Sequence, residues 1–205
     1  MQILLLALQA SLREQSGRAS SPDDAALVKR ARKLDDEAWR IIFERHYPRL
    51  YSYIYYRVGD ASVAEDLCGE LFEKAVKNIH RFKSRDGGLA GWLTRIAQNL
   101  TYDYYRRRKA RPSDPLELNE SWLSGGDDPD RSLLNRESTD YLRRALQKLT
   151  PEQRDVILLR FIAQMRTSEV ASIMGKTPGA IKALQHRALA ALRREMEALG
   201  YHGLI

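Results

Sequence analysis

The sequence predicts an all-α fold: two small helical domains joined by a flexible acidic linker, the second of which carries a helix-turn-helix. Apolar residues recur at helical spacing over most of the 205 residues. That pattern stops between residues 112 and 132, where proline, glycine and acidic residues accumulate. Residues 167–187 place a turn glycine and a capping threonine between two short helical patterns. We therefore expect an N-terminal extension at 1–22, domains at 23–111 and 133–205, and a linker at 112–132.

Composition favours an anionic partner and a reducing compartment. The chain carries 34 Lys and Arg against 27 Asp and Glu, a formal net charge of +7. The excess is local: residues 77–111 hold ten basic residues and two acids, and residues 141–195 hold eleven and four, whereas residues 112–135 hold six acids and one arginine. The single cysteine, Cys68, excludes an intramolecular disulfide and agrees with a cytoplasmic location.

Neither a membrane span nor a signal peptide is expected. No run of residues approaches the length of about 20 apolar residues that spans a bilayer. Residues 3–8 are apolar, yet no basic residue precedes them, as a signal peptide requires. The extension is better interpreted as an amphipathic helix or as a segment without consequence.

The first domain is expected to begin with a helical region from about Asp23 to Arg57. Leu27, Leu34, Ile42 and Ile54 fall at intervals that can share an apolar face, and Pro48 is expected to kink or break the helix. The tyrosines of this region are interpreted mainly as core residues with their hydroxyl groups at the edge. They are Tyr47, Tyr51, Tyr53, Tyr55 and Tyr56.

A capping box formed by Ser62 and Glu65 predicts the start of the next helix. One face of this helix is apolar and includes Cys68, interpreted as a small core residue. The opposite face is acidic and gathers Glu65, Asp66, Glu70 and Glu73. Taken alone, an acidic helical face is more often simply solvated, and the alternative is a docking surface for a basic partner.

A basic loop at 80–88 leads to a helix from Leu89 to about Lys109. Its outer surface interleaves aromatic and basic side chains: Trp92, Arg95, Asn99, Tyr102, Tyr105, Arg106, Arg107, Arg108 and Lys109. Unstacked bases need flat surfaces and their backbone needs positive charge, so this surface is a candidate site for single-stranded nucleic acid. An equally weighted alternative is a set of core aromatics followed by a solvated run of charge.

The second domain is expected to contain the helix-turn-helix after two leading helices. The first runs from Leu133 to Leu149, and a capping box at Thr150 and Gln153 begins the next. Within the helix-turn-helix, local signals predict a cap, a sharp turn, a second cap and a proline at the first helical position. They are Thr167, Gly175, Thr177 and Pro178. The final helix is expected to run to about Leu199.

Four segments in order make the chain resemble the extracytoplasmic-function (ECF) sigma factors, the smallest members of the sigma-70 family. They are Ala64-Glu-Asp-Leu-Cys-Gly-Glu-Leu-Phe72; Gly91-Trp-Leu-Thr-Arg-Ile-Ala-Gln-Asn99 with Arg106-Arg-Arg108; Leu149-Thr-Pro-Glu-Gln-Arg-Asp-Val156; and Gly179-Ala-Ile-Lys182 with His186-Arg187. The resemblance covers roughly residues 23–195. It implies a promoter-specificity subunit without cofactor or catalysis, which binds core RNA polymerase, opens promoter DNA and is commonly held inactive by an anti-sigma factor.

The resemblance also implies the residues of three sites. Core polymerase, through the clamp helices of its largest subunit, is expected to bind Glu65, Asp66, Leu67, Glu70, Leu71 and Phe72. The minus-ten promoter element, with one base flipped out, is expected to contact Phe82, Lys83, Ser84, Arg85, Trp92, Arg95, Asn99, Tyr102, Arg106 and Arg107. The minus-thirty-five element is expected to contact Thr177, Pro178, Gly179, Lys182, Ala183, Gln185, His186 and Arg187. The linker would thread into the polymerase near the RNA exit path.

One pair of residues departs from the family pattern. Leu184-Gln185 stands where the family often has Arg-Leu, so one DNA contact is missing. Gln185 is a candidate to replace it, although the bidentate preference of glutamine is for adenine.

Two other function classes fit the sequence less well than this family. The alternative is a stand-alone helix-turn-helix regulator that binds a duplex operator without polymerase. An enzyme is not expected, because the four histidines show no ligand spacing with one another or with Cys68, and no phosphate-binding glycine loop occurs. The histidines are His46, His80, His186 and His202.

Overall fold

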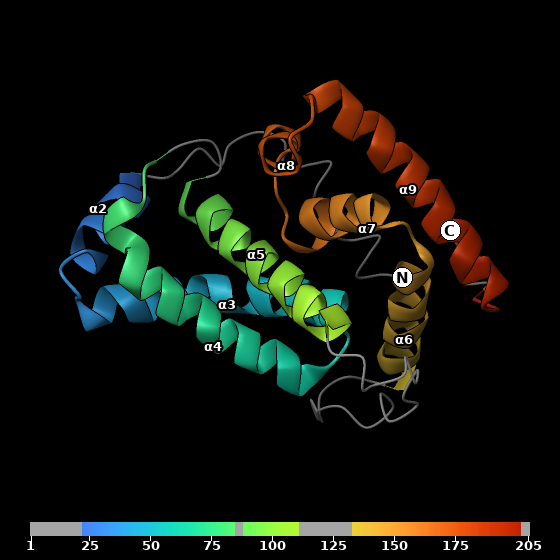
Figure 1. Cartoon of the computed structure of the whole chain (residues 1–205), viewed down its shortest axis with the longest axis horizontal. Coiled ribbons are helices and arrows are strands. Elements are labelled where there is room, and N and C mark those ends of the chain that lie inside the picture. Colours follow the sequence, from blue (N-terminus) through green and yellow to red (C-terminus); the bar gives the residue numbers. More distant parts are fainter. Residues whose placement is uncertain (1–21, 85–87, 111–132, 202–205) are drawn as a thin grey trace. The chain divides into compact units, whose positions relative to one another are not determined.

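The computed structural model describes residues 22–84, 88–110 and 133–201, and every regular element within these ranges is helical (Figure 1). The α-helices are α2 (Pro22–Ala31), α3 (Asp36–Val58), α4 (Ala61–Asn78), α5 (Gly88–Ala110), α6 (Leu133–Lys148), α7 (Pro151–Ile157), α8 (Thr167–Met174) and α9 (Pro178–Ala198). A short 3-10 helix, η1 (Ile79–Arg81), follows α4, and a π-helix, η3 (Leu158–Ile162), follows α7. The chain divides into two compact units, one containing α2 to α5 and the other α6 to α9. The predicted fold class is confirmed.

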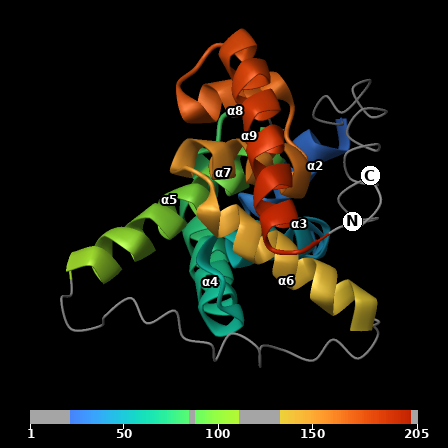
Figure 2. The same ribbon diagram turned by 90° about the vertical axis from the view of Figure 1, so that its right-hand side faces the viewer.

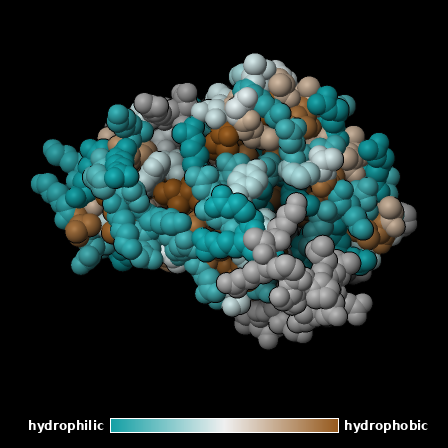
Figure 3. Space-filling model, viewed as in Figure 1, coloured by the Kyte–Doolittle hydropathy of each residue, from teal (hydrophilic) through white to brown (hydrophobic). Residues whose placement is uncertain are grey.

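The predicted linker at 112–132 and the predicted extension, apart from Pro22, lie outside the described residues. On the face drawn in Figure 3, hydrophilic residues cover most of the described surface and hydrophobic residues occur as separate spots. The partner surfaces of this chain must therefore be found among mixed polar and aromatic side chains.

The first unit is built around α3, which packs against α4 and α5, while α2 packs on α3 (Figures 1 and 2). Its core holds Ile42, Tyr53, Ile54, Leu71 and Leu93, all fully buried. Cys68 on α4 is also buried, as expected. These contacts fix the outer faces of α3, α4 and α5 relative to one another.

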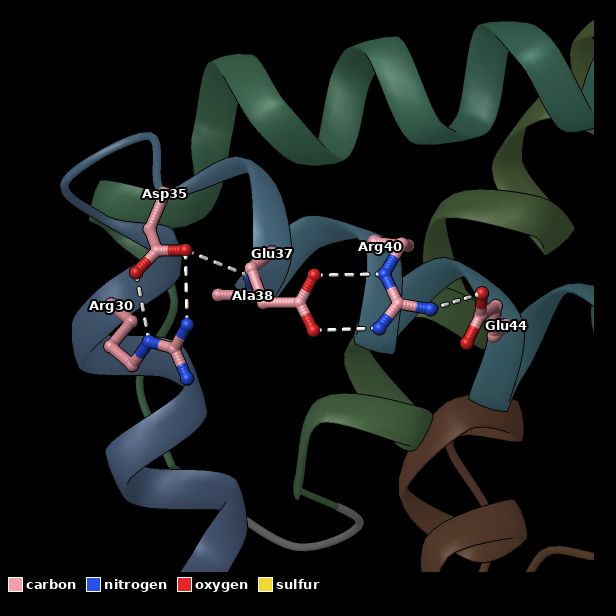
Figure 4. A network of polar contacts seen from close by, with 6 residues as sticks. All are labelled: Arg30, Asp35, Glu37, Ala38, Arg40 and Glu44. Atoms are coloured by element: carbon pink, nitrogen blue, oxygen red, sulfur yellow. Dashed lines mark hydrogen bonds and ion pairs between the residues drawn. The ribbon is translucent and has the colours of Figure 1, made fainter.

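The predicted helix from Asp23 to Arg57 is wrong in where it breaks. The break lies at residues 32–35, where Leu34 has a φ of 58° and an exposed side chain instead of an apolar core position. The Asp35 carboxylate then begins α3, accepting from the Ala38 N–H at 3.0 Å and from Arg30 at 2.8 Å (Figure 4). Pro48 lies inside a continuous α3. Because Pro48 is on the exposed side, water can replace the amide donor that it lacks.

Two predicted caps are displaced by one or two residues. Helix α4 is capped by Asp60, whose carboxylate accepts from the Val63 N–H at 2.9 Å, so the Ser62 box is wrong. Helix α8 begins at Thr167 itself, and the residue before it, Arg166, donates its N–H to the Glu169 carboxylate at 2.7 Å. In both cases the preceding chain ends in an extended residue earlier than expected, and the cap follows that backbone change.

The second unit contains the predicted helix-turn-helix, α8 and α9. Gly175 ends α8 with a φ of 63°, and the Thr177 hydroxyl caps α9 by accepting from the Ala180 N–H at 3.2 Å. The predicted capping box of Thr150 and Gln153 is present at the start of α7. Ile181 and Leu184 of α9 are buried, while α7 continues into the π-helix η3, which the apolar pattern does not distinguish from an α-helix.

Candidate promoter and polymerase surfaces

The exposed side of α9 offers basic side chains that make no bond within the described parts of the chain. Lys182, His186 and Arg187 are exposed and have no hydrogen bond or ion pair to other described residues. Thr177, Pro178, Gly179 and Ala183 are exposed beside them. A Cβ built at Gly179 would meet nothing within 4 Å, so a ligand backbone can approach closely there. Seven of the eight residues expected at the minus-thirty-five element therefore share an open surface.

The eighth residue, Gln185, differs from this set because it is half-buried and already bonded. Its Oε1 accepts a hydrogen bond at 3.0 Å from Nε of Arg160, a buried residue of η3. Arg160 also donates through Nη1 to the carbonyl of Met165. Burial lowers the pKa of Arg160, and the nearby Glu169 opposes this shift. No local sequence signal identifies this pair, since its members are 25 residues apart.

A second candidate surface lies on α5 and combines an exposed tyrosine with an arginine from another helix. The ring of Tyr102 is 45% exposed, and the guanidinium carbon of Arg57 lies 4.5 Å from its centroid. Tyr105 donates its hydroxyl to the Arg57 carbonyl. Asn99, Arg106 and Arg107 are exposed along the same helix, with Arg106 paired to Asp103 at 2.9 Å. Arg57 was not predicted as part of this surface.

The loop before α5 is anchored by a buried aromatic contact. Phe82 is only 6% exposed, and its ring centroid lies 5.5 Å from that of the half-buried Trp92. The Phe82 carbonyl also accepts from Nη2 of Arg32 at 2.7 Å. Phe82 thus supports the surface from beneath, whereas Lys83 and Ser84 are exposed on it. Arg95 is half-buried, and Arg85 lies outside the described residues.

The expected docking residues on α4 fall into two groups. Glu65 and Asp66 are exposed, and Glu70 and Phe72 are half-buried, with Glu70 paired to Lys74 at 2.8 Å. Leu67 and Leu71 are buried and belong to the core of the unit. Only the first group is available to a partner in this structure.

A row of stacked rings on α3 adjoins this face. Phe43, Tyr47, Tyr51 and Tyr55 follow one another at four-residue intervals, with neighbouring centroids 4.7, 5.8 and 6.1 Å apart. Phe72 of α4 lies 4.8 Å from Phe43. Phe43 is 44% exposed, and burial raises the pKa values of Tyr47 and Tyr51. Of the five tyrosines interpreted as core residues, Tyr53 is fully buried, but its hydroxyl group is buried too and does not lie at the edge; the other four are half-buried. The four-residue spacing was the available signal for this row.

Comparison with known proteins identifies the family. The family model "Sigma-70 region 2" matches residues 42–111, and "Sigma-70, region 4" matches residues 139–192. The chain belongs to the sigma-70 family. It is 35% identical over 185 residues to the ECF RNA polymerase sigma factor BldN of Streptomyces coelicolor, an alignment covering 86% of this chain and 69% of BldN. It is 27% identical to the ECF sigma factor SigW of Bacillus subtilis, covering 84% and 96% of the two chains.

Two solved structures share the fold of this chain. The structure of CnrH in complex with the cytosolic domain of CnrY has a TM-score of 0.66 at 23% identity, covering 85% of this chain and 97% of the other. RpoE in complex with the anti-sigma factor NepR from Bartonella quintana has a TM-score of 0.57 at 21% identity, covering 77% and 96%. At these identities the likeness concerns the fold alone.

The chain is an ECF RNA polymerase sigma factor, which functions in promoter recognition and transcription initiation. The stand-alone regulator does not account for the region 2 match of its first unit. Sigma factors are generally initiation factors without catalytic activity. Within residues 22–84, 88–110 and 133–201, no three potential His, Cys, Asp or Glu ligands gather around a possible metal position, and no helix is long and apolar enough to cross a membrane.

Proposed function

We propose that this sigma factor binds core polymerase through α4 and contacts two promoter elements, one with the α5 surface and one with α9, without catalysis of its own. The observation that carries this proposal is that each unit presents an exposed helical face of nucleic-acid chemistry. Tyr102 and Arg107 supply an exposed ring and an exposed cation in the first unit, with the buried Arg57 against the ring, and Lys182 and Arg187 supply unpaired cations in the second. The residues predicted for the three sites remain our proposed contacts, apart from the buried Leu67, Leu71 and Phe82 and the already bonded Gln185.

The α5 surface would bind the opened minus-ten strand. Base stacking on an aromatic ring stabilises binding by about 1–3 kcal/mol per base, which offsets the few kcal/mol that unstacking a base costs. Tyr102 has the exposed area for such stacking, and Arg57 holds its ring from the other helix. Arg107 is exposed for the phosphates.

The α9 surface would enter the major groove at the minus-thirty-five element. Thr177 fixes the beginning of the helix, so the exposed residues of its first turns point to one side. Lys182 and Arg187 would bind phosphates or guanine edges. We propose the segment at 112–132 as the tether between the two promoter contacts.

The acidic side of α4 would dock on a basic helical surface of the polymerase. Glu65 and Asp66 supply charge, and the adjoining ring row from Phe43 to Tyr55, with Phe72, supplies area for apolar contact. Aromatic anchors surrounded by polar residues are common at the centres of protein interfaces.

An anti-sigma factor is the proposed regulator, and the cytoplasm is the proposed location. RpoE of Bartonella quintana is solved with its anti-sigma factor NepR. An anti-sigma factor of this chain would cover the same α4 and ring-row surface, because doing so would prevent polymerase binding directly.

Reconstitution with core RNA polymerase tests the proposal. The full-length chain is mixed with core enzyme and a library of promoter fragments, and bound fragments and transcripts are sequenced. We expect specific transcripts that require both proteins. Absence of core binding and of transcription would contradict the proposal, as would tight binding of a duplex operator by the chain alone with no effect of core enzyme.

A pair of matched variants locates the docking surface. Glu65→Gln with Asp66→Asn removes exposed charge from the proposed face, so we expect weaker core binding and a smaller salt dependence. Asp36→Asn with Glu37→Gln is the control, because it removes the same number of exposed charges from the first turn of α3 and not from the acidic face of α4. Equal weakening by both variants would place the docking surface elsewhere.

A further inference from the structure

We infer that Gln185 reads no base: Arg160 holds its side chain as a positioning contact that sets the recognition helix α9 against η3. This inference rests on the proposed role of α9 at the upstream promoter element. It concerns the place where the chain departs from the sequence pattern of the family. It follows that Gln185 does not contribute to a preference for adenine in the upstream element.

Arg160 ties three parts of the second unit together. It belongs to η3, donates through Nη1 to the Met165 carbonyl ahead of α8, and donates through Nε to Gln185 Oε1 on α9. Arg160 is 6% exposed; its bond to Met165 is buried, and its bond to the half-buried Gln185 is partly buried. Hydrogen bonds from a guanidinium group are stronger than those between neutral groups, and a buried donor without its acceptor is costly. The geometry of the pair is therefore well maintained.

The chemistry of the pair fixes which way the carboxamide points. A guanidinium group only donates hydrogen bonds, so the atom facing Arg160 must be the oxygen of Gln185 and not its nitrogen. The amide orientation thus follows from the partner and is not an arbitrary choice between oxygen and nitrogen. The NH₂ group of Gln185 lies at the other end of the carboxamide. It can donate two hydrogen bonds and cannot accept one.

This orientation turns the oxygen that adenine recognition needs towards Arg160, so that only the second lone pair of Oε1 is left without a partner. Glutamine recognises adenine by accepting from the N6 amino group and donating to N7 at the same time. With Oε1 directed at Arg160 of η3, the end of the carboxamide that faces away from Arg160 can only donate, and its N–H groups can bond to guanine, thymine and phosphate oxygens as well as to adenine N7. Base selection must then come from other residues of α9.

The contact instead acts on the placement of the whole helix. Lys182 lies about one turn before Gln185 and His186 beside it, so a shift of α9 relative to η3 moves both together. Loss of the bond between Arg160 and Gln185 is expected to weaken the base preference at several positions of the upstream element. Loss of a direct base contact would instead change the base preference at one position.

The test compares base-preference profiles of the holoenzyme on fragments randomised in the upstream element. Gln185→Glu keeps an acceptor for Arg160, so we expect the wild-type order of base preferences, with uniformly weaker binding from the added negative charge. Gln185→Met and Arg160→Met each break the bond, and we expect similar broadening over several positions, with the double variant no broader than either single variant.

Direct reading of adenine would give different results. Gln185→Glu would shift one position from adenine towards cytosine, and Gln185→Met would lose roughly 5- to 150-fold of preference at that position alone. Arg160→Met would leave that preference intact. Any of these outcomes overturns the inference. Circular dichroism and core binding confirm that each variant is folded, and a wild-type holoenzyme without any upstream base preference would contradict the proposed function instead.

Discussion

His46 on α3 is held neutral by its surroundings. Burial lowers its pKa to about 4, and the charges of Arg45 and Arg49 add to this effect. Its Nε2 is a buried atom with no hydrogen-bond partner among the described residues. The unfolded chain therefore binds a proton at higher pH than the folded chain. Stability from this residue is complete above its ordinary pKa of about 6.5 and is lost as the pH falls towards 4.

Replacement of His46 by leucine should reduce the acid sensitivity of the first unit. From pH 7 to pH 4 the wild-type chain is expected to lose about 3 kcal/mol of unfolding free energy through this residue, and His46→Leu is expected to lose that much less. Urea denaturation at several pH values measures the difference in slope. His80→Leu, at an exposed position, is the control. An identical pH dependence of wild type and His46→Leu would show that His46 takes up its proton at the same pH in the folded and the unfolded chain.

Two substitutions of Tyr102 distinguish the contribution of its ring from that of its hydroxyl group on the α5 surface. Tyr102→Leu removes the ring that Arg57 contacts, and we expect binding of a single-stranded minus-ten fragment by the holoenzyme to weaken roughly 5- to 150-fold. Tyr102→Phe keeps the ring and should retain most of the affinity. Fluorescence anisotropy with a labelled fragment distinguishes the two. Equal losses in both variants would assign the contact to the hydroxyl group.

At the scale of elements, the cap of α4 gives a direct test of where the helix begins. Asp60→Ala removes the acceptor of the Val63 N–H and is expected to lower the unfolding free energy by about 1 kcal/mol. Ser62→Ala lies within the first turn and should be neutral or slightly stabilising, because alanine is the better helix former. Urea denaturation of both variants provides the comparison. A larger loss for Ser62→Ala would restore the capping box predicted from the sequence.

The elements that could be predicted are those with local signals. Gly175 predicts the turn of the helix-turn-helix, and Thr177 predicts the beginning of its second helix. Both residues occupy the predicted positions. The helix start predicted at Ser62 is wrong because Asp60, two residues earlier, is an equally good capping acceptor. The choice is made by Gly59, whose left-handed conformation ends α3 and leaves Asp60 extended.

The parts of the site that were missed depend on residues distant in the chain. Arg57 reaches Tyr102 and Arg160 reaches Gln185 across 45 and 25 residues, so neither pairing has a local pattern. Each of the two arginines lies in a stretch whose other residues are mostly apolar or aromatic. Burial of such a residue is decided by the partner that another helix supplies.

At the scale of the whole molecule, the two compact units allow the proposed upstream promoter contact and the proposed polymerase contact to be changed separately. The proposed docking residues belong to α4 in the first unit, and the cations of α9 belong to the second. No described hydrogen bond or ion pair within the chain depends on Lys182 or Arg187. Their removal therefore changes charge at one surface without breaking a contact that holds either unit together.

Lys182→Ala with Arg187→Ala should weaken binding at the upstream element while core binding is unchanged. Each lost phosphate contact lowers the slope of log affinity against log salt by about 1, so the double variant is expected to lower it by about 2. Holoenzyme binding to promoter fragments over a salt series measures the slope, and titration with core enzyme measures docking. Arg193→Ala is the matched control, because Arg193 is engaged with Glu197 further along α9. Equal loss of promoter and core binding would mean that α9 is not the reading helix.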